Sequence, residues 1–134
     1  MRMELTWKGG LAFEVDAPSG ARFTVESNGE GGPTPIEAFV CSLASCSAMD
    51  VVSILQKMRQ PVESYALEVE WERGPKDVFP RPVTGVRIRH VLRGNGLDPE
   101  AVEKAVKLSD EKYCGVTASL RTPPAIQTTW DVQG

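Results

Sequence analysis

Two cysteines provide the chemistry that this sequence can offer. Cys46 lies in the middle of a long apolar segment, and Cys114 lies in the run Glu111-Lys112-Tyr113-Cys114-Gly115-Val116. The sequence has one histidine, no glycine-rich phosphate-binding loop and no Cys-x-x-Cys pair, so no other residue is a comparable nucleophile. If the fold brings the two thiols together, they form a redox couple.

A cysteine attacks as the thiolate, which needs a stabilising environment and access to substrate. Cys46 lies eleven residues beyond Pro35, roughly 16 Å along the predicted helix, where the helix dipole has faded. Asp50, one turn further on, disfavours a neighbouring thiolate, so an arginine from elsewhere is expected to compensate. The candidates, with Arg22 as first choice, are Arg2, Arg22, Arg81, Arg87, Arg89 and Arg121. Cys114 is better placed if a helix begins just before it.

Each candidate residue also has a purely structural interpretation. Cys46 fits a small apolar residue in a core helix, and Cys41, about 140° around the helix from it, is predicted only to pack. The position of Glu37 is explained by helix capping, and His90 alternates with apolar residues as a core histidine would. A zinc site of Cys46, Cys114 and His90 lacks ligand-pair spacing, so we expect neither a metal nor a cofactor.

Alternation of polar and apolar residues predicts the strands. A hairpin is predicted over residues 3–15, and the remaining strands over 21–26, 65–71, 86–92 and 126–132. The strand over 65–71 has acidic residues on its outer face, and the strand over 86–92 has basic residues there. The two strands are therefore expected to form an antiparallel pair joined by ion pairs.

Capping residues predict where the helices begin. Thr34-Pro35-Ile36-Glu37 forms a capping box that starts a helix reaching to about Arg59, and Asp98-Pro99 starts a second. The run Ser109-Asp110-Glu111-Lys112 suggests a further helix that carries Cys114. The first helix is apolar on every face, so we expect it to be buried nearly all round.

Length and composition restrict the class of protein. The 134 residues predict a single α+β domain over 1–134, and the net charge of −3, with both signs interspersed, argues against nucleic-acid and membrane partners. Three cysteines and an N-terminus without a secretory signal suggest a cytoplasmic protein. One small sheet cannot cover the first helix, so we predict an intertwined homodimer.

At three places the sequence resembles the OsmC/Ohr family, and the resemblance extends over nearly the whole chain. They are the residues 32–37, the run Leu43-Ala44-Ser45-Cys46-Ser47-Ala48-Met49-Asp50-Val51-Val52, and the segment 108–116. The motif Cys-Ser-Ala-x-Asp is similar to that of the OsmC-like branch rather than the organic hydroperoxide resistance branch.

The resemblance implies a fold and an activity. The implied fold is an antiparallel sheet packed on a long buried central helix, with the sheets of both subunits of a homodimer wrapped around two such helices. The implied activity is a peroxidase, in which Cys46 attacks an organic hydroperoxide and becomes a sulfenic acid. Cys114 then forms a disulfide with it, and an external dithiol such as a lipoylated protein reopens that disulfide.

The sequence departs from the family pattern at one position. The peroxidase branches have a Glu ten residues before the first cysteine, which orients an arginine, whereas this chain has Ile36, and Glu37 lies about 100° further round the helix. We therefore expect catalytic Cys46 and Cys114 with Arg22, Glu37 and Asp50 in supporting roles. The alternatives are a redox-sensing or small-molecule-binding protein without efficient turnover, and a fold in which both cysteines only pack.

Overall fold

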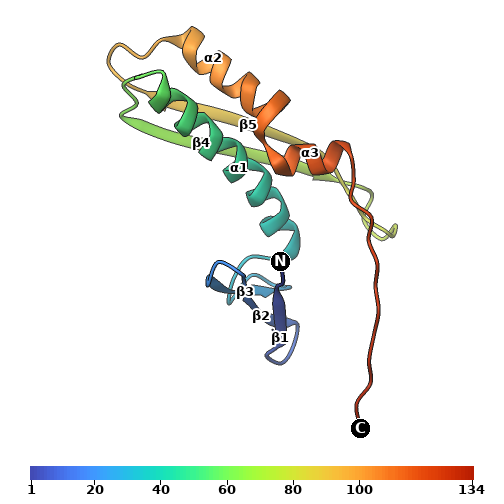
Figure 1. The fold of residues 1–134 in the computed structure, drawn as a ribbon. Helices are drawn as coiled ribbons and strands as arrows, with labels where there is room; N and C mark the ends of the chain where they lie inside the picture. Colours follow the sequence, from blue (N-terminus) through green and yellow to red (C-terminus); the bar gives the residue numbers. More distant parts are fainter.

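The computed structural model describes residues 1–134 as a mixed α+β fold with antiparallel sheets (Figure 1). The elements in chain order are β1 (Glu4–Trp7), β2 (Ala12–Asp16), β3 (Arg22–Glu26), α1 (Pro35–Lys57), β4 (Ser64–Arg73), β5 (Val83–Arg93), α2 (Pro99–Leu108), the π-helical turn η1 (Ser109–Tyr113) and α3 (Gly115–Arg121).

The strands form two separate sheets. One has the order β1-β2-β3 and the other is the long β4-β5 hairpin. The predicted ion pairs across the hairpin are confirmed, because Arg87 contacts Glu70 and Glu72 and Arg89 contacts Glu68 at N···O distances of 2.9–3.2 Å. These exposed pairs contribute little to stability, but they agree with the antiparallel register.

Helix α1 begins where the capping box predicts. The Glu37 amide donates to Thr34 Oγ1 over 3.2 Å, and the Thr34 amide donates to Glu37 Oε1 over 2.9 Å. The helix ends at Lys57, two residues before the predicted end, because Met58 is the C-cap and Arg59 has a φ of 55°.

The prediction that α1 is buried nearly all round is wrong for the single chain. Its buried residues are confined to one side, and they are Val40, Leu43, Ala44, Ser47, Val51 and Leu55. Met49 and Val52 on other sides are exposed. Figure 1 shows the reason: α1 runs from the small N-terminal sheet along the β4-β5 hairpin, and no element of the same chain covers its open side.

The core lies at the C-terminal half of α1. Val51 and Leu55 of α1 pack against Ala101 and Ala105 of α2, with residues of β4 and β5 around them. Small residues at the α2 positions let the two helices approach closely. This contact fixes the end of α2, from which the chain continues into the cysteine-bearing turn.

The predicted last strand over 126–132 is not formed. Residues 122–134 have no regular structure, and Ile126, Trp130 and Val132 are each 87–88% exposed. In Figure 1 this segment extends away from α3 and past the N-terminal sheet. A strand needs an edge with which to pair its backbone groups, and a single chain brings no edge to this segment.

By length and composition alone, α1 also meets the criteria for a membrane-spanning helix. Its most apolar 18-residue window has a mean hydropathy of 1.8, and 22% of that window is buried. Core helices of water-soluble proteins meet the same criteria, so this observation by itself does not assign α1 to a membrane.

Candidate active site

A π-helical turn positions Cys114. The amide of Cys114 donates to the carbonyl of Ser109 over 2.8 Å, which closes the wide turn η1 between α2 and α3. The predicted helix begins one residue after Cys114 rather than before it, so Cys114 is the N-cap of α3 and its Sγ accepts from the Thr117 amide over 3.5 Å. Short π-helical segments are frequent at functional sites because they redirect side chains out of the regular helical register.

The fold brings the two predicted cysteines together. Cys46 and Asp50 are four residues apart on α1 and therefore share one face, which is turned toward Cys114. The two Sγ atoms and a carboxylate oxygen of Asp50 all lie within 4.8 Å of one another. An interpretation in which both cysteines only pack requires them to lie too far apart or to point away from each other, whereas these two sulfur atoms are close together.

The two thiols have different environments. Cys46 is partly buried, whereas Cys114 is only 4% exposed. Burial raises the pKa of the Cys114 thiol, but hydrogen bonds from Thr117, Cys46 and the Val116 backbone outweigh it and leave that pKa below its ordinary value. The environment thus favours the thiolate at Cys114, the less accessible cysteine.

Asp50 is held by a buried serine. The Ser109 hydroxyl donates to Asp50 Oδ2 over 2.8 Å, and it lies 3.4 Å from the Ser47 hydroxyl. Ser109 is fully buried and Ser47 is 8% exposed, so this polar group lies inside the contact between α1 and η1. The hydrogen bond orients the Asp50 carboxylate beside both sulfur atoms.

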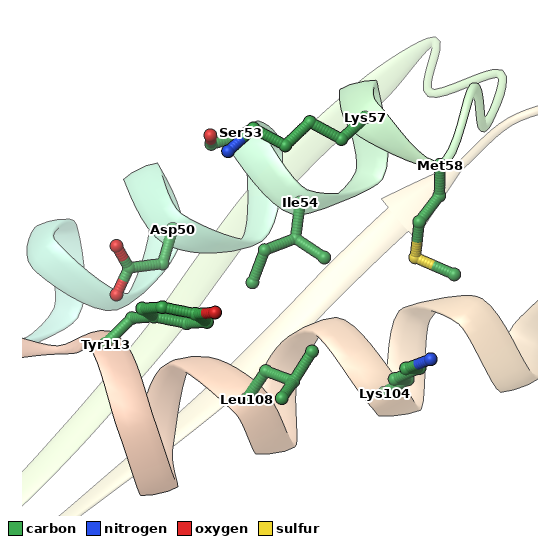
Figure 2. A pocket seen from close by; sticks show the side chains of 8 residues that line it. All are labelled: Asp50, Ser53, Ile54, Lys57, Met58, Lys104, Leu108 and Tyr113. Atoms are coloured by element: carbon green, nitrogen blue, oxygen red, sulfur yellow. The ribbon is translucent and has the colours of Figure 1, made fainter.

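A cavity of about 390 Å³ opens next to Asp50, between α1 and the α2–η1 segment. In Figure 2 the Asp50 carboxylate lies beside the ring of Tyr113, and Ile54 and Leu108 face each other across the cavity. The complete lining is Asp50, Ser53, Ile54, Lys57, Met58, Lys104, Leu108 and Tyr113. A ligand with an apolar body and an anionic group would find complementary surfaces here.

Of the three supporting residues predicted from the sequence, only Asp50 lies beside the two cysteines. Asp50 lies in the site, whereas Glu37 is held by the capping box, where hydrogen bonds from Thr34 lower its pKa. The first-choice Arg22 lies on β3 and pairs with Asp16 over 2.7 Å.

The other arginines considered are also engaged elsewhere within the chain. Each guanidinium contacts a carboxylate or a backbone carbonyl: Arg2 contacts Glu4, Arg81 contacts Gly74, Arg87 contacts Glu70 and Glu72, Arg89 contacts Glu68 and Arg121 contacts Asp110. The expected arginine partner of Cys46 is therefore not identified in a single chain.

His90 has the structural role that the sequence predicts, whereas Cys41 does not pack in the core of the single chain. Cys41 is exposed on α1 and lies outside the cluster of Cys46, Asp50 and Cys114. Nδ1 of His90 shares a 2.6 Å hydrogen bond with the Tyr65 hydroxyl, so this histidine is a satisfied, partly buried residue of the sheet. It is not close enough to the cysteines to belong to that cluster.

Sequence reasoning missed Ser109 and Thr117. The sequence around Ser109 predicts only the start of a helix, and Thr117 carries no signal because its contribution is a backbone amide. A hydroxyl at the end of an amphipathic helix, five residues before a cysteine, is the one local feature that could have suggested Ser109.

Comparisons with known proteins give a consistent family. The family described as OsmC-like protein matches residues 27–129. Protein YhfA of Escherichia coli K12 is 35% identical over 133 residues, which cover 98% of each chain. The crystal structure of a hypothetical protein from Aquifex aeolicus has a TM-score of 0.79 and 31% identity, and covers 98% of this chain and 95% of its own.

A more distant structure shows only the fold. The organic hydroperoxide resistance protein OhrB of Bacillus subtilis is 18% identical, with a TM-score of 0.56, over 92% of this chain and 93% of its own. The arrangement of helices and sheets described above is thus shared with a protein named for hydroperoxide resistance.

Proposed function

Because this chain belongs to the OsmC-like protein family, we propose that it is a thiol-dependent peroxidase that reduces organic hydroperoxides through Cys46 and Cys114. The observation that carries the proposal is the cluster itself, in which both sulfur atoms and the Asp50 carboxylate lie within 4.8 Å of one another. A structural neighbour named for organic hydroperoxide resistance adds support at the level of the fold.

The proposed first step oxidises Cys46. Its thiolate attacks the distal oxygen of the hydroperoxide, the S–O bond forms and the O–O bond breaks, and the alkoxide leaves as an alcohol after taking up one proton. The sulfur loses two electrons, and Cys46 becomes a sulfenic acid.

The proposed second step closes the disulfide. The Cys114 thiolate attacks the Cys46 sulfenic sulfur, the S–S bond forms, and hydroxide leaves as water after protonation. An external dithiol then restores both thiols by exchange. The roles follow the environments: Cys46 is the more accessible thiol, and the hydrogen bonds from Thr117 favour the attacking thiolate at Cys114.

The cavity beside Asp50 is the proposed substrate site. Ile54 and Leu108 provide an apolar wall, while Lys57 and Lys104 provide positive charge. A hydroperoxide with an apolar body and a carboxylate would place its reactive end near Asp50 and the thiols while its anionic end meets a lysine.

A homodimer is the proposed assembly. Helix α1 and strand β4 border an apolar hollow of about 490 Å³, and large apolar side chains are exposed on the N-terminal sheet and the C-terminal segment. A second copy would cover these surfaces, and the exposed apolar side chains support this proposal. Its arginines would also be available to the site that lacks one.

Steady-state turnover tests the proposal. Purified protein with cumene hydroperoxide and a dithiol should consume several equivalents of peroxide per chain. Cys46→Ser should abolish turnover, and Cys114→Ser should stop after one equivalent with a sulfenic acid that dimedone traps. Cys41→Ser is the matched control on the same helix and should keep full activity; equal residual activity in all three variants would contradict the proposal.

The engaged arginines favour a second candidate function, a redox sensor without efficient turnover. Without a cation to stabilise the charge that develops during the reaction, Cys46 would react slowly with peroxide, and each chain would be oxidised once rather than cycled. Such a protein should give a stoichiometric burst with cumene hydroperoxide and no multiple turnover with any dithiol.

A further inference from the structure

The cluster of Cys46, Asp50 and Cys114 contains the ligand types of a metal site as well as a redox couple. Two thiolate sulfurs and one carboxylate oxygen are ligands that Zn²⁺ accepts in tetrahedral coordination. We propose that the reduced protein binds one thiophilic divalent cation, with Zn²⁺ as its representative, through these three side chains. The proposal uses the cysteines of the proposed function but does not depend on their turnover.

The spacing is close to what a zinc ion requires. Zn–S bonds of about 2.3 Å and Zn–O bonds of about 2.1 Å place tetrahedral ligand atoms about 3.5–3.8 Å apart. The three ligand atoms lie within 4.8 Å of one another, so a contraction of about 1 Å completes the triad. Cys46 and Asp50 approach from one face of α1, and Cys114 approaches from the start of α3.

The surroundings orient these ligands. The Ser109 hydroxyl donates to one oxygen of Asp50 over 2.8 Å, which leaves the other oxygen for a cation. The Thr117 amide points at Cys114 Sγ over 3.5 Å. Hydrogen bonds of this kind fix ligand orientation in protein metal sites.

Charge and access are also compatible with a cation. Two thiolates and a carboxylate carry three negative charges, which a divalent ion would largely neutralise. Asp50 also lines the cavity of about 390 Å³, so water or a substrate oxygen can reach the fourth coordination position. The only histidine, His90, is hydrogen-bonded to Tyr65 and is not needed as a ligand.

Binding through both cysteines would couple the metal to oxidation. When an organic hydroperoxide oxidises the metal-bound dithiolate, two protons are taken up, and the products are the disulfide, an alcohol, water and the free cation. Oxidation thereby removes two of the three ligands. A bound cation would in turn slow the attack of Cys46 on peroxide without preventing it.

A competition titration tests the site. Metal-free, fully reduced, full-length protein is titrated anaerobically with Zn²⁺ against the chromogenic chelator 4-(2-pyridylazo)resorcinol. We expect one Zn²⁺ per chain, lost in Cys46→Ser and in Cys114→Ser and weakened at least about tenfold in Asp50→Asn. Cys41→Ser should bind as the wild type does, and equal binding by Cys46→Ser and the wild type would overturn the proposal.

Cobalt gives a readout that does not depend on activity. Co²⁺ bound by two thiolates in a tetrahedral site should give a sulfur-to-cobalt charge-transfer band in the near ultraviolet, which Cys46→Ser should lack. A Co²⁺ complex without this band would contradict coordination by the thiols. Circular dichroism of each variant confirms that a lost signal does not reflect unfolding.

Turnover measured with and without EDTA separates the two proposals. Zinc binding by the reduced protein without peroxidase turnover would retain the metal site and refute the peroxidase. Turnover without zinc binding would retain the peroxidase and refute the metal site. If both proposals hold, Zn²⁺ should inhibit turnover, EDTA should restore it, and one equivalent of cumene hydroperoxide should release the metal.

Discussion

Asp50 accepts a hydrogen bond of 2.8 Å from the hydroxyl of Ser109, a residue that is fully buried and 59 positions further along the chain. This bond joins α1, which carries Cys46, to the π-helical turn that leads to Cys114. The distance between the two thiols therefore depends on this buried hydrogen bond.

Ser109→Ala tests that contact. The substitution removes the donor to a partly buried carboxylate, so the free energy of unfolding should fall by about 1–3 kcal/mol. Formation of the disulfide should also slow, because Asp50 and the turn lose their connection. Urea denaturation and thiol quantification after peroxide addition measure the two effects. Ser42→Ala on the exposed part of α1 is the control and should change neither.

The sheet should respond to pH through His90. Burial lowers the pKa of His90 below its ordinary value of 6.5, so the unfolded chain binds a proton more readily than the folded chain does. The free energy of unfolding should hence decrease as the pH falls below 6.5. Urea denaturation between pH 5 and pH 8 measures this dependence.

The variant His90→Gln provides the comparison. It has no titrating group at this position, and its stability should vary less with pH over the same range. An unchanged pH dependence in the variant would assign the effect to other residues. The partner Tyr65, whose pKa burial raises to about 12, stays protonated throughout that range.

The capping box should contribute measurably to the stability of α1. Thr34→Ala removes the oxygen that accepts from the Glu37 amide, and the expected loss is about 1 kcal/mol of unfolding free energy. Thermal or urea denaturation measures the loss. Lys76→Ala in the exposed loop between β4 and β5 should leave stability unchanged, and a loss of the same size there would argue against the capping explanation.

The proposed dimer predicts an alternating pattern in the C-terminal segment. If residues 126–132 pair as a strand with another copy, Trp130→Asp should weaken association by at least about tenfold, because Trp130 would lie on the covered face. Thr129→Asp on the opposite face should have a smaller effect. Sedimentation velocity at several concentrations measures association, and a monomeric wild type would refute the dimer.

Local patterns predicted most of the elements. The capping box located the start of α1 to the residue, and the alternating charges of β4 and β5 identified a hairpin whose ion pairs are present. These features depend on neighbouring residues or on a fixed strand period, which a sequence displays directly.

Features that depend on contacts between distant parts of the chain could not be predicted as well from the sequence. The sequence carries no local signal for the π-helical turn, and Ser109 gains its role only through a contact with Asp50, 59 positions away. The strand predicted over 126–132 has suitable alternation but no edge within one chain. The sequence predicts Cys46 and Cys114 as a catalytic couple with Asp50 in a supporting role, but it does not predict that a buried serine holds the Asp50 carboxylate beside both sulfur atoms.

The proposed function depends on Cys46 and Cys114 forming one redox couple. The most direct measurement is peptide mapping by mass spectrometry before and after one equivalent of cumene hydroperoxide is added to the reduced protein. We predict that two free thiols per chain are lost and that a new Cys46–Cys114 disulfide appears, with Cys41 still reduced. Both thiols remaining free, or a disulfide through Cys41, would contradict it.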